Sequence, residues 1–288
     1  MKLGISGFAW TSRFEERHLP LANVVKEMGF DGFEVAMFEP NDLPIDKTRR
    51  AFKAVDLGCT VCAILPPGIN PISPEPGVRR KSIQHLIRCV EATAELEARL
   101  IGGPLYAPIG YLPDHRPTAQ EWAWAVEAFQ SLGEVLDRYE IDLSIEPVNR
   151  SETYFLRTAT EAKRLCEDIG HTRVGVTIDT FHANIEEKSI VHAIQMLGPR
   201  LKHLHASEND RAMLGQGHVD FPAIIGALQD SGYEGYLMIE GFGYDDLEKI
   251  APGYLWAGIG VTPEDLAREG LQYLRNIRGS QSRDHRVN

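Results

Sequence analysis

Short apolar runs rich in β-branched residues recur along the chain and alternate with longer segments that have the periodicity of a helix. Each run has about the length of a strand, and helical or turn sequence separates it from the next run. The pattern predicts eight strands, over residues 2–6, 32–37, 59–65, 99–103, 142–147, 174–180, 201–207 and 235–242.

The segments between these strands carry helix signals. Thr118 is followed three residues later by Glu121, which makes a capping box, and glycines stand where helices return to strands. Seven helices are predicted, over residues 46–55, 77–98, 118–139, 158–169, 187–197, 221–231 and 263–277. Because strands and helices alternate without a linker, the fold class is α/β, and we expect a single (β/α)8 TIM barrel over residues 1–278. Residues 279–288 are expected to form a polar C-terminal tail.

The charge and composition of the chain limit the kinds of partner and compartment that we expect for the protein. The net charge is −11 and no Lys/Arg-rich run stands out, so we expect no nucleic acid and no anionic membrane as partner. The chain has no apolar run of 18 residues and no signal-like start, which favours a cytoplasmic protein. Its 4 cysteines are too few for a disulfide framework, and we interpret Cys59 and Cys62 as buried thiols.

Four residues with metal-binding side chains end the last four predicted strands: Glu146, Asp179, His205 and Glu240. They lie 33, 26 and 35 residues apart, about one strand–helix unit each. In a barrel the carboxyl ends of the strands meet at one face, where active sites lie, whereas an open sheet gives no reason for the four to converge. Three carboxylates and one imidazole suit an octahedral Mn²⁺, Mg²⁺ or Co²⁺ better than a structural Zn²⁺.

Other polar residues are predicted to lie near the same face. Glu152, His182 and Arg211 follow the fifth, sixth and seventh strands, and His203 shares a strand face with His205 as a core or supporting residue. The proline-rich loops after the third and fourth strands are natural pocket walls, in which Tyr106 and Tyr111 would present apolar faces to a ligand.

The strings EPVNRSE (146–152), DTFHANIEE (179–187), HLHASENDR (203–211) and IEGF (239–242) resemble the ketose 3-epimerases, the D-tagatose/D-psicose 3-epimerase group of the xylose-isomerase-like barrel superfamily. The similarity extends through nearly the whole chain. It implies epimerisation of a free ketose at C3 with one divalent cation per chain, Mn²⁺ first and Mg²⁺ or Co²⁺ as alternatives. It further implies these roles: Glu146, Asp179, His205 and Glu240 as metal ligands, Glu146 and Glu240 also as the acid/base pair, and Glu152, His182, Arg211 and Phe242 as substrate contacts.

Some questions stay open at this level. Gly241 and Ala257 stand where the family often has Pro and Arg, so the preferred ketose is undecided. An isomerase or dehydratase of a related keto-sugar or inosose is the main alternative. A three-metal endonuclease of the same superfamily and a non-catalytic sugar sensor are disfavoured, the first by the acidic charge and the second by the presence of both glutamates. We expect a homodimer or homotetramer, and the sequence does not decide between them.

Overall fold

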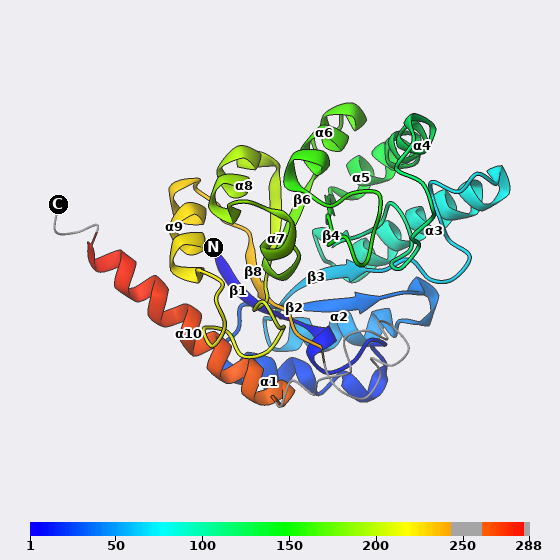
Figure 1. Ribbon diagram of the computed structural model, residues 1–288. Helices are drawn as coiled ribbons and strands as arrows, with labels where there is room; N and C mark the ends of the chain where they lie inside the picture. The colour runs from blue at the N-terminus through cyan, green and yellow to red at the C-terminus, as the bar shows by residue number, and fades with distance from the viewer. Residues whose placement is uncertain (243–260, 285–288) are drawn as a thin grey trace.

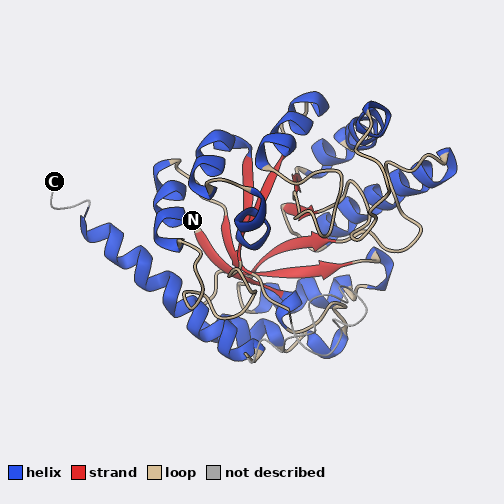
Figure 2. Cartoon of the chain, viewed as in Figure 1, coloured by secondary structure: helices blue, strands red, loops and turns tan. Residues whose placement is uncertain are grey.

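Eight parallel strands form a closed barrel (Figures 1 and 2). The computed structural model describes residues 1–242 and 261–284, so Ala257 lies outside the described part of the chain. Each strand pairs with the next in sequence, and β1 pairs with β8. The strands are β1 Lys2–Ser6, β2 Gly32–Met37, β3 Gly58–Ala63, β4 Leu100–Gly103, β5 Asp142–Ile145, β6 Val174–Asp179, β7 Leu201–Ala206 and β8 Tyr236–Ile239. The predicted (β/α)8 barrel is confirmed.

Helices surround the barrel. They are α1 Leu21–Met28, α2 Ile45–Ala54, α3 Pro76–Glu95, α4 Ala119–Gln130, α5 Gly133–Tyr139, α6 Ala159–Ile169, α7 Thr180–Glu186, α8 Ile190–Leu197, α9 Phe221–Asp230 and α10 Pro263–Asp284. The 3₁₀ turns are η1 Gly7–Ala9, η2 Glu16–His18, η3 Pro40–Asp42 and η4 Gly198–Arg200. In the described part of the chain, none of the helices combines the length and the apolar character that crossing a membrane would need.

The observed helices differ from the predicted ones at four places. The short helices α1 and α7 fall in none of the predicted ranges. The predicted helix over 118–139 is interrupted at Ser131 and Leu132, where α4 ends and α5 begins. The last helix is longer than predicted, because α10 continues to Asp284 and includes part of the expected polar tail. Its C-terminal end extends past the barrel in Figure 1, and residues 285–288 are outside the described part.

The interior of the barrel is polar near the carboxyl ends of its strands. Side chains alternate with period two, so that on β7 His203 and His205 share the face opposite to Leu204. Glu34 of β2 reaches His203 of β7, two strands that are not neighbours, so both side chains point into the barrel. The other faces of these strands contribute apolar residues such as Phe33 and Leu204 to the core beneath the helices. The alternation thus directs apolar groups outward to the helices and chemically active groups inward.

Gly103 lets the carboxyl end of β4 lie close to the carboxyl end of β3. Its φ is +129°, and a Cβ atom there would lie 2.1 Å from the carbonyl oxygen of Ala63. The Gly103 carbonyl also accepts a hydrogen bond from the backbone N–H of Glu146, at 3.1 Å. This position therefore requires glycine and fixes the backbone that carries Glu146.

We predict that Gly103→Ala lowers the free energy of unfolding by about 2 kcal/mol or more, because strained φ and overpacking each cost about 1–3 kcal/mol. Chemical denaturation of the purified variant measures the change. Gly77→Ala is the matched control, because nothing lies within 4 Å of a Cβ built at Gly77. Equal stability of the two variants would contradict the prediction.

Candidate active site at the carboxyl ends of the strands

The four predicted metal ligands converge at one end of the barrel. Asp179 ends β6, His205 lies in β7, and Glu146 and Glu240 directly follow β5 and β8. All four are buried, with at most 4% of each residue exposed. Glu146, Asp179 and His205 each offer one ligand atom within 4.8 Å of the others. Glu240 joins them, since its Oε1 lies 3.7 Å from Nδ1 of His205.

Local backbone contacts hold these side chains in place. The N–H of Glu240 donates to the carbonyl of Ala206 at 3.1 Å, as that of Glu146 does to Gly103, so both glutamates continue the strand ladders. Asp179 is the N-cap of α7, and its Oδ1 accepts the N–H of Phe181 at 2.9 Å. Its Oδ2 is left to face the site. The strand ends therefore position the cluster more rigidly than loops would.

His182 and Glu152 share a buried partner, Asn149. The side-chain Nδ2 of Asn149 donates to Oε1 of Glu152 at 2.8 Å, and its backbone N–H donates to Nδ1 of His182 at 3.2 Å. Burial lowers the pKa of His182 to about 3, so the imidazole is neutral near pH 7. Its Nε2 lies 3.1 Å from Nη2 of Arg211 and 3.5 Å from Oδ2 of Asp179.

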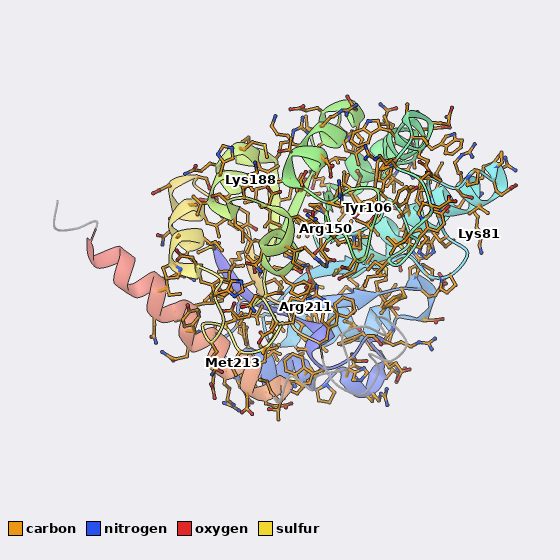
Figure 3. All side chains as sticks on the ribbon, viewed as in Figure 1. Lys81, Tyr106, Arg150, Lys188, Arg211 and Met213 are labelled. Carbon is orange, nitrogen blue, oxygen red and sulfur yellow. The ribbon has the colours of Figure 1, made fainter. Side chains whose placement is uncertain are left out.

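Arg211 brings positive charge to the cluster from the loop between β7 and α9 (Figure 3). Its Nη2 donates to Oδ2 of Asp179 at 3.0 Å and lies 3.6 Å from Oε2 of Glu240. The guanidinium carbon is 4.3 Å from the ring centres of both Phe181 and Phe242, so the cation is held between two aromatic rings. The backbone of Arg211 has φ +58°, in the left-handed region.

A pocket opens above the cluster with one polar and one apolar wall. Glu146, Glu152, His182, Arg211 and Glu240 form the polar wall. The apolar wall consists of Phe8, Cys62, Ile64, Pro104, Ile109, Val148 and Phe242. Such a pocket suits a small ligand with several oxygens along a carbon chain.

The expected role of the two tyrosines is not supported. Tyr106 is fully buried, donates its hydroxyl to the carbonyl of Leu156 at 2.9 Å and belongs to the core. Tyr111 is 36% exposed and packs edge-on against Tyr154. Ile109, from the same loop, lines the pocket in their place. Tyr106 could not be assigned from sequence, because a loop tyrosine with a buried backbone partner has no local signature.

The charges of the cluster shift the pKa values of its members. Burial raises the pKa of Glu240 well above its usual range, and Asp179 and Glu146 add to the shift, against the opposing influence of His205 and Arg211. Burial lowers the pKa of His205, but the carboxylates of Glu34, Glu240 and Glu146 outweigh it and raise the pKa well above its usual value. The site therefore favours positive charge at the position of His205.

The donor set fits a divalent cation. Nδ1 of His205 lies 3.3 Å from Oε1 of Glu146 and 3.7 Å from Oε1 of Glu240, so a nitrogen and two carboxylate oxygens face one point. Asp179 supplies a third carboxylate within 4.8 Å of Glu146 and His205. Carboxylate oxygens with one imidazole are ligands typical of Mn²⁺ and Mg²⁺ sites.

Two residues of this region were not singled out from the sequence. Asn149 lies inside the string EPVNRSE, where nothing distinguishes it from a loop residue. Glu34 lies in the middle of β2 and is fully buried. An acidic residue inside an otherwise apolar strand, GFEVAM, was a usable signal, because carboxylates are almost never buried without a partner.

A closed parallel barrel with buried acids, an imidazole and an arginine at the carboxyl ends of its strands defines a TIM-barrel enzyme. A family model described as "Xylose isomerase-like TIM barrel" matches residues 22–277. The chain is 34% identical over 251 residues to a D-psicose 3-epimerase of Agrobacterium fabrum (84% of this chain, 85% of that protein). It is 31% identical to an L-ribulose 3-epimerase of Mesorhizobium japonicum (84% and 81%). The solved structure of an L-ribulose 3-epimerase superimposes with a TM-score of 0.89 at 27% identity, over 98% of this chain and 97% of that one.

The chain therefore belongs to the xylose isomerase-like TIM barrel family and, within it, to the ketose 3-epimerase group. The protein is therefore an enzyme of the carbohydrate isomerase class.

We predict that His182 makes folding stability depend on acid pH. Its pKa is about 3 in the folded state and 6.5 ordinarily, so below about pH 6.5 the unfolded chain binds a proton that the folded chain does not. Stability is then lost as the pH falls from about 6.5, by up to about 1.4 kcal/mol per pH unit. Denaturant unfolding in EDTA from pH 6.5 to 4.5 should show a steeper loss for the natural protein than for His182→Gln. Parallel pH profiles would contradict this assignment.

Proposed function

We propose that the protein is a divalent-metal-dependent epimerase that inverts C3 of a free ketose through an enediolate. The observation that carries the proposal is the position of Glu146 and Glu240, whose carboxyl groups reach the same imidazole from the ends of β5 and β8 and line one pocket. Membership of the ketose 3-epimerase group supports it.

In this proposal Glu146, Asp179, His205 and Glu240 hold one cation, with Mn²⁺ first and Mg²⁺ or Co²⁺ as alternatives. The bound cation would stabilise the negative charge that develops on the substrate oxygens when C3 loses its proton. Asp179 and His205 have no part in proton transfer and serve only to bind the cation.

Glu146 and Glu240 carry the proton transfer. Epimerisation removes a proton from one face of C3 and returns one to the other face, so two carboxyl groups are needed, one ionised and one protonated. The raised pKa of Glu240 suits the protonated member in one direction of the reaction. For the opposite epimer the two roles are exchanged.

The other pocket residues orient the sugar. Arg211 and His182 would bind the sugar oxygens near C1 and C2. Glu152, held by Asn149, would accept a hydrogen bond from the C1 hydroxyl. Phe242 closes the pocket beside Arg211, and the apolar wall would take the carbon chain. These groups determine which face of C3 meets each glutamate.

A free sugar is preferred to a phosphorylated one because the glycine-rich turn after β7 is already occupied. The N–H of Gly215 donates to Oε1 of Glu208 at 3.0 Å, and that of Gln216 donates to the carbonyl of Met213 at 3.2 Å. These two N–H groups are therefore not available to bind a phosphate.

Three further expectations stay predictions: that the protein is cytoplasmic, that residues 1–278 act as one catalytic domain, and that the chain forms a homodimer or homotetramer. Light scattering after size-exclusion chromatography distinguishes these two assemblies.

We predict that the Mn²⁺-loaded protein in D₂O incorporates deuterium at C3 of D-fructose, D-tagatose or L-ribulose, with the 3-epimer accumulating. Proton NMR after removal of the metal measures this, and EDTA-treated protein should show no exchange until Mn²⁺ is restored. Exchange at C1 with formation of an aldose would instead identify an isomerase. No exchange with any of the three would contradict the proposal.

We predict that Glu240→Gln and Glu146→Gln each reduce C3 exchange by at least about 10²- to 10⁴-fold, the usual contribution of a general acid or base. Mn²⁺ binding should be weakened but retained, because three ligands remain. Glu121→Gln makes the same chemical change at a buried carboxyl at the start of α4 and should leave the rate unchanged. Normal turnover by Glu240→Gln would show that the two-carboxylate mechanism is wrong.

A further inference from the structure

Glu34 lies in the barrel interior next to the ligand cluster and outside the pocket described above. It is fully buried in β2, and its Oε2 lies 2.8 Å from Nε2 of His203. The hydroxyl of Thr60, on β3, donates to the same oxygen at 3.2 Å. Its Oε1 lies 3.0 Å from Nε2 of His205. One buried carboxylate therefore meets both histidines of β7 across the barrel.

His205 lies between two sets of carboxylates. Its Nε2 faces Glu34, and its Nδ1 faces Glu146 and Glu240 on the other side of the ring. Oε1 of Glu34 and Nε2 of His205 face each other at ion-pair distance, and within the described residues neither atom has a hydrogen-bond partner. The His203 ring packs edge-on against that of His205, with ring centres 4.9 Å apart and an angle of 86°. These contacts leave the His205 ring little freedom to turn.

The hydrogen-bonding capacity of a carboxylate determines where the protons are. An ionised carboxylate only accepts hydrogen bonds, so each histidine that presents Nε2 to Glu34 carries a proton on that nitrogen. Nδ1 of His205 is hydrogen-bonded to Oε1 of Glu146 at 3.3 Å, so without a cation this nitrogen carries a proton as well. A cation that displaces this proton leaves the Nε2–H tautomer, whose lone pair on Nδ1 lies on the side of Glu146 and Glu240. That tautomer is the one that can bind a cation among the carboxylates.

We propose that Glu34, supported by His203 and Thr60, is a positioning residue that holds His205 as the Nε2–H tautomer and directs its Nδ1 to the cation. The inference rests on the proposed function, because it assumes that His205 binds a metal. A carboxylate behind a metal-binding histidine fixes the ring and raises the basicity of the ligand nitrogen, and losing it commonly costs about 10–100-fold in metal affinity.

Glu34→Gln tests this because an amide keeps the volume but replaces one acceptor with a donor. If the amide N–H₂ faces His205, Nε2 must accept and the proton moves to Nδ1, where it competes with the cation. If it faces His203 instead, the chain of contacts that holds the pair is broken. In either case the population of His205 that is ready to bind a cation falls.

The first experiment determines the tautomer directly. Long-range ¹H–¹⁵N NMR of the natural protein, labelled with ¹⁵N-histidine and saturated with diamagnetic Mg²⁺, should show His205 protonated on Nε2 only. Glu34→Gln should show a share of His205 protonated on Nδ1. An unprotonated Nε2 of His205 in the Mg²⁺-saturated natural protein would overturn the inference, even if the variant does not fold.

The second experiment measures affinity. Titration of metal-free protein with Mn²⁺, followed by electron paramagnetic resonance, should give a Kd about 10–100-fold weaker for Glu34→Gln than for the natural protein. Glu121→Gln should match the natural protein, and Glu34→Asp, which keeps the charge at shorter reach, should fall between. Equal Kd values for the natural protein and Glu34→Gln would overturn the inference alone, whereas a natural protein that binds no Mn²⁺ would overturn the proposed function with it.

Discussion

The arrangement of the site depends on the confinement of several buried carboxylates around one imidazole. Glu146 and Glu240 approach His205 on one side and Glu34 approaches it on the other. In a water-poor interior such charges repel one another strongly unless positive charge lies among them. Arg211 supplies part of that charge beside Asp179 and Glu240. The site is therefore arranged to favour a cation at the carboxyl ends of the strands.

The barrel makes this concentration of charge tolerable. Its outer strand faces carry apolar groups that pack beneath the helices, so apolar burial that stabilises the fold is available outside the polar interior near the site. The inward-facing positions are free to carry polar groups that satisfy one another, as the hydroxyls of Thr177 and Ser144 on the neighbouring strands β6 and β5 do at 2.6 Å. The apolar groups of the core and the polar groups of the barrel interior thus lie on opposite faces of the same strands.

The two walls of the pocket offer a ligand different kinds of contact, one polar and one apolar. The polar wall contains ionisable groups whose protonation states differ, with His182 neutral and the pKa of Glu240 raised. The apolar wall, with Phe8 and Ile109, offers no hydrogen bonds and selects by shape. A ligand would find polar contacts at the first wall and a limit on its size and shape at the second.

The sequence by itself determined the barrel and the four positions at the ends of its last strands, because both follow from local periodicity and from the geometry of parallel strands. The tertiary structure decided what no local pattern encodes: the contact of Glu34 with His203 between β2 and β7, the burial of Tyr106, and the left-handed backbone that directs Arg211 to Asp179. Such contacts join residues far apart in the chain, and they exist only once the barrel has closed.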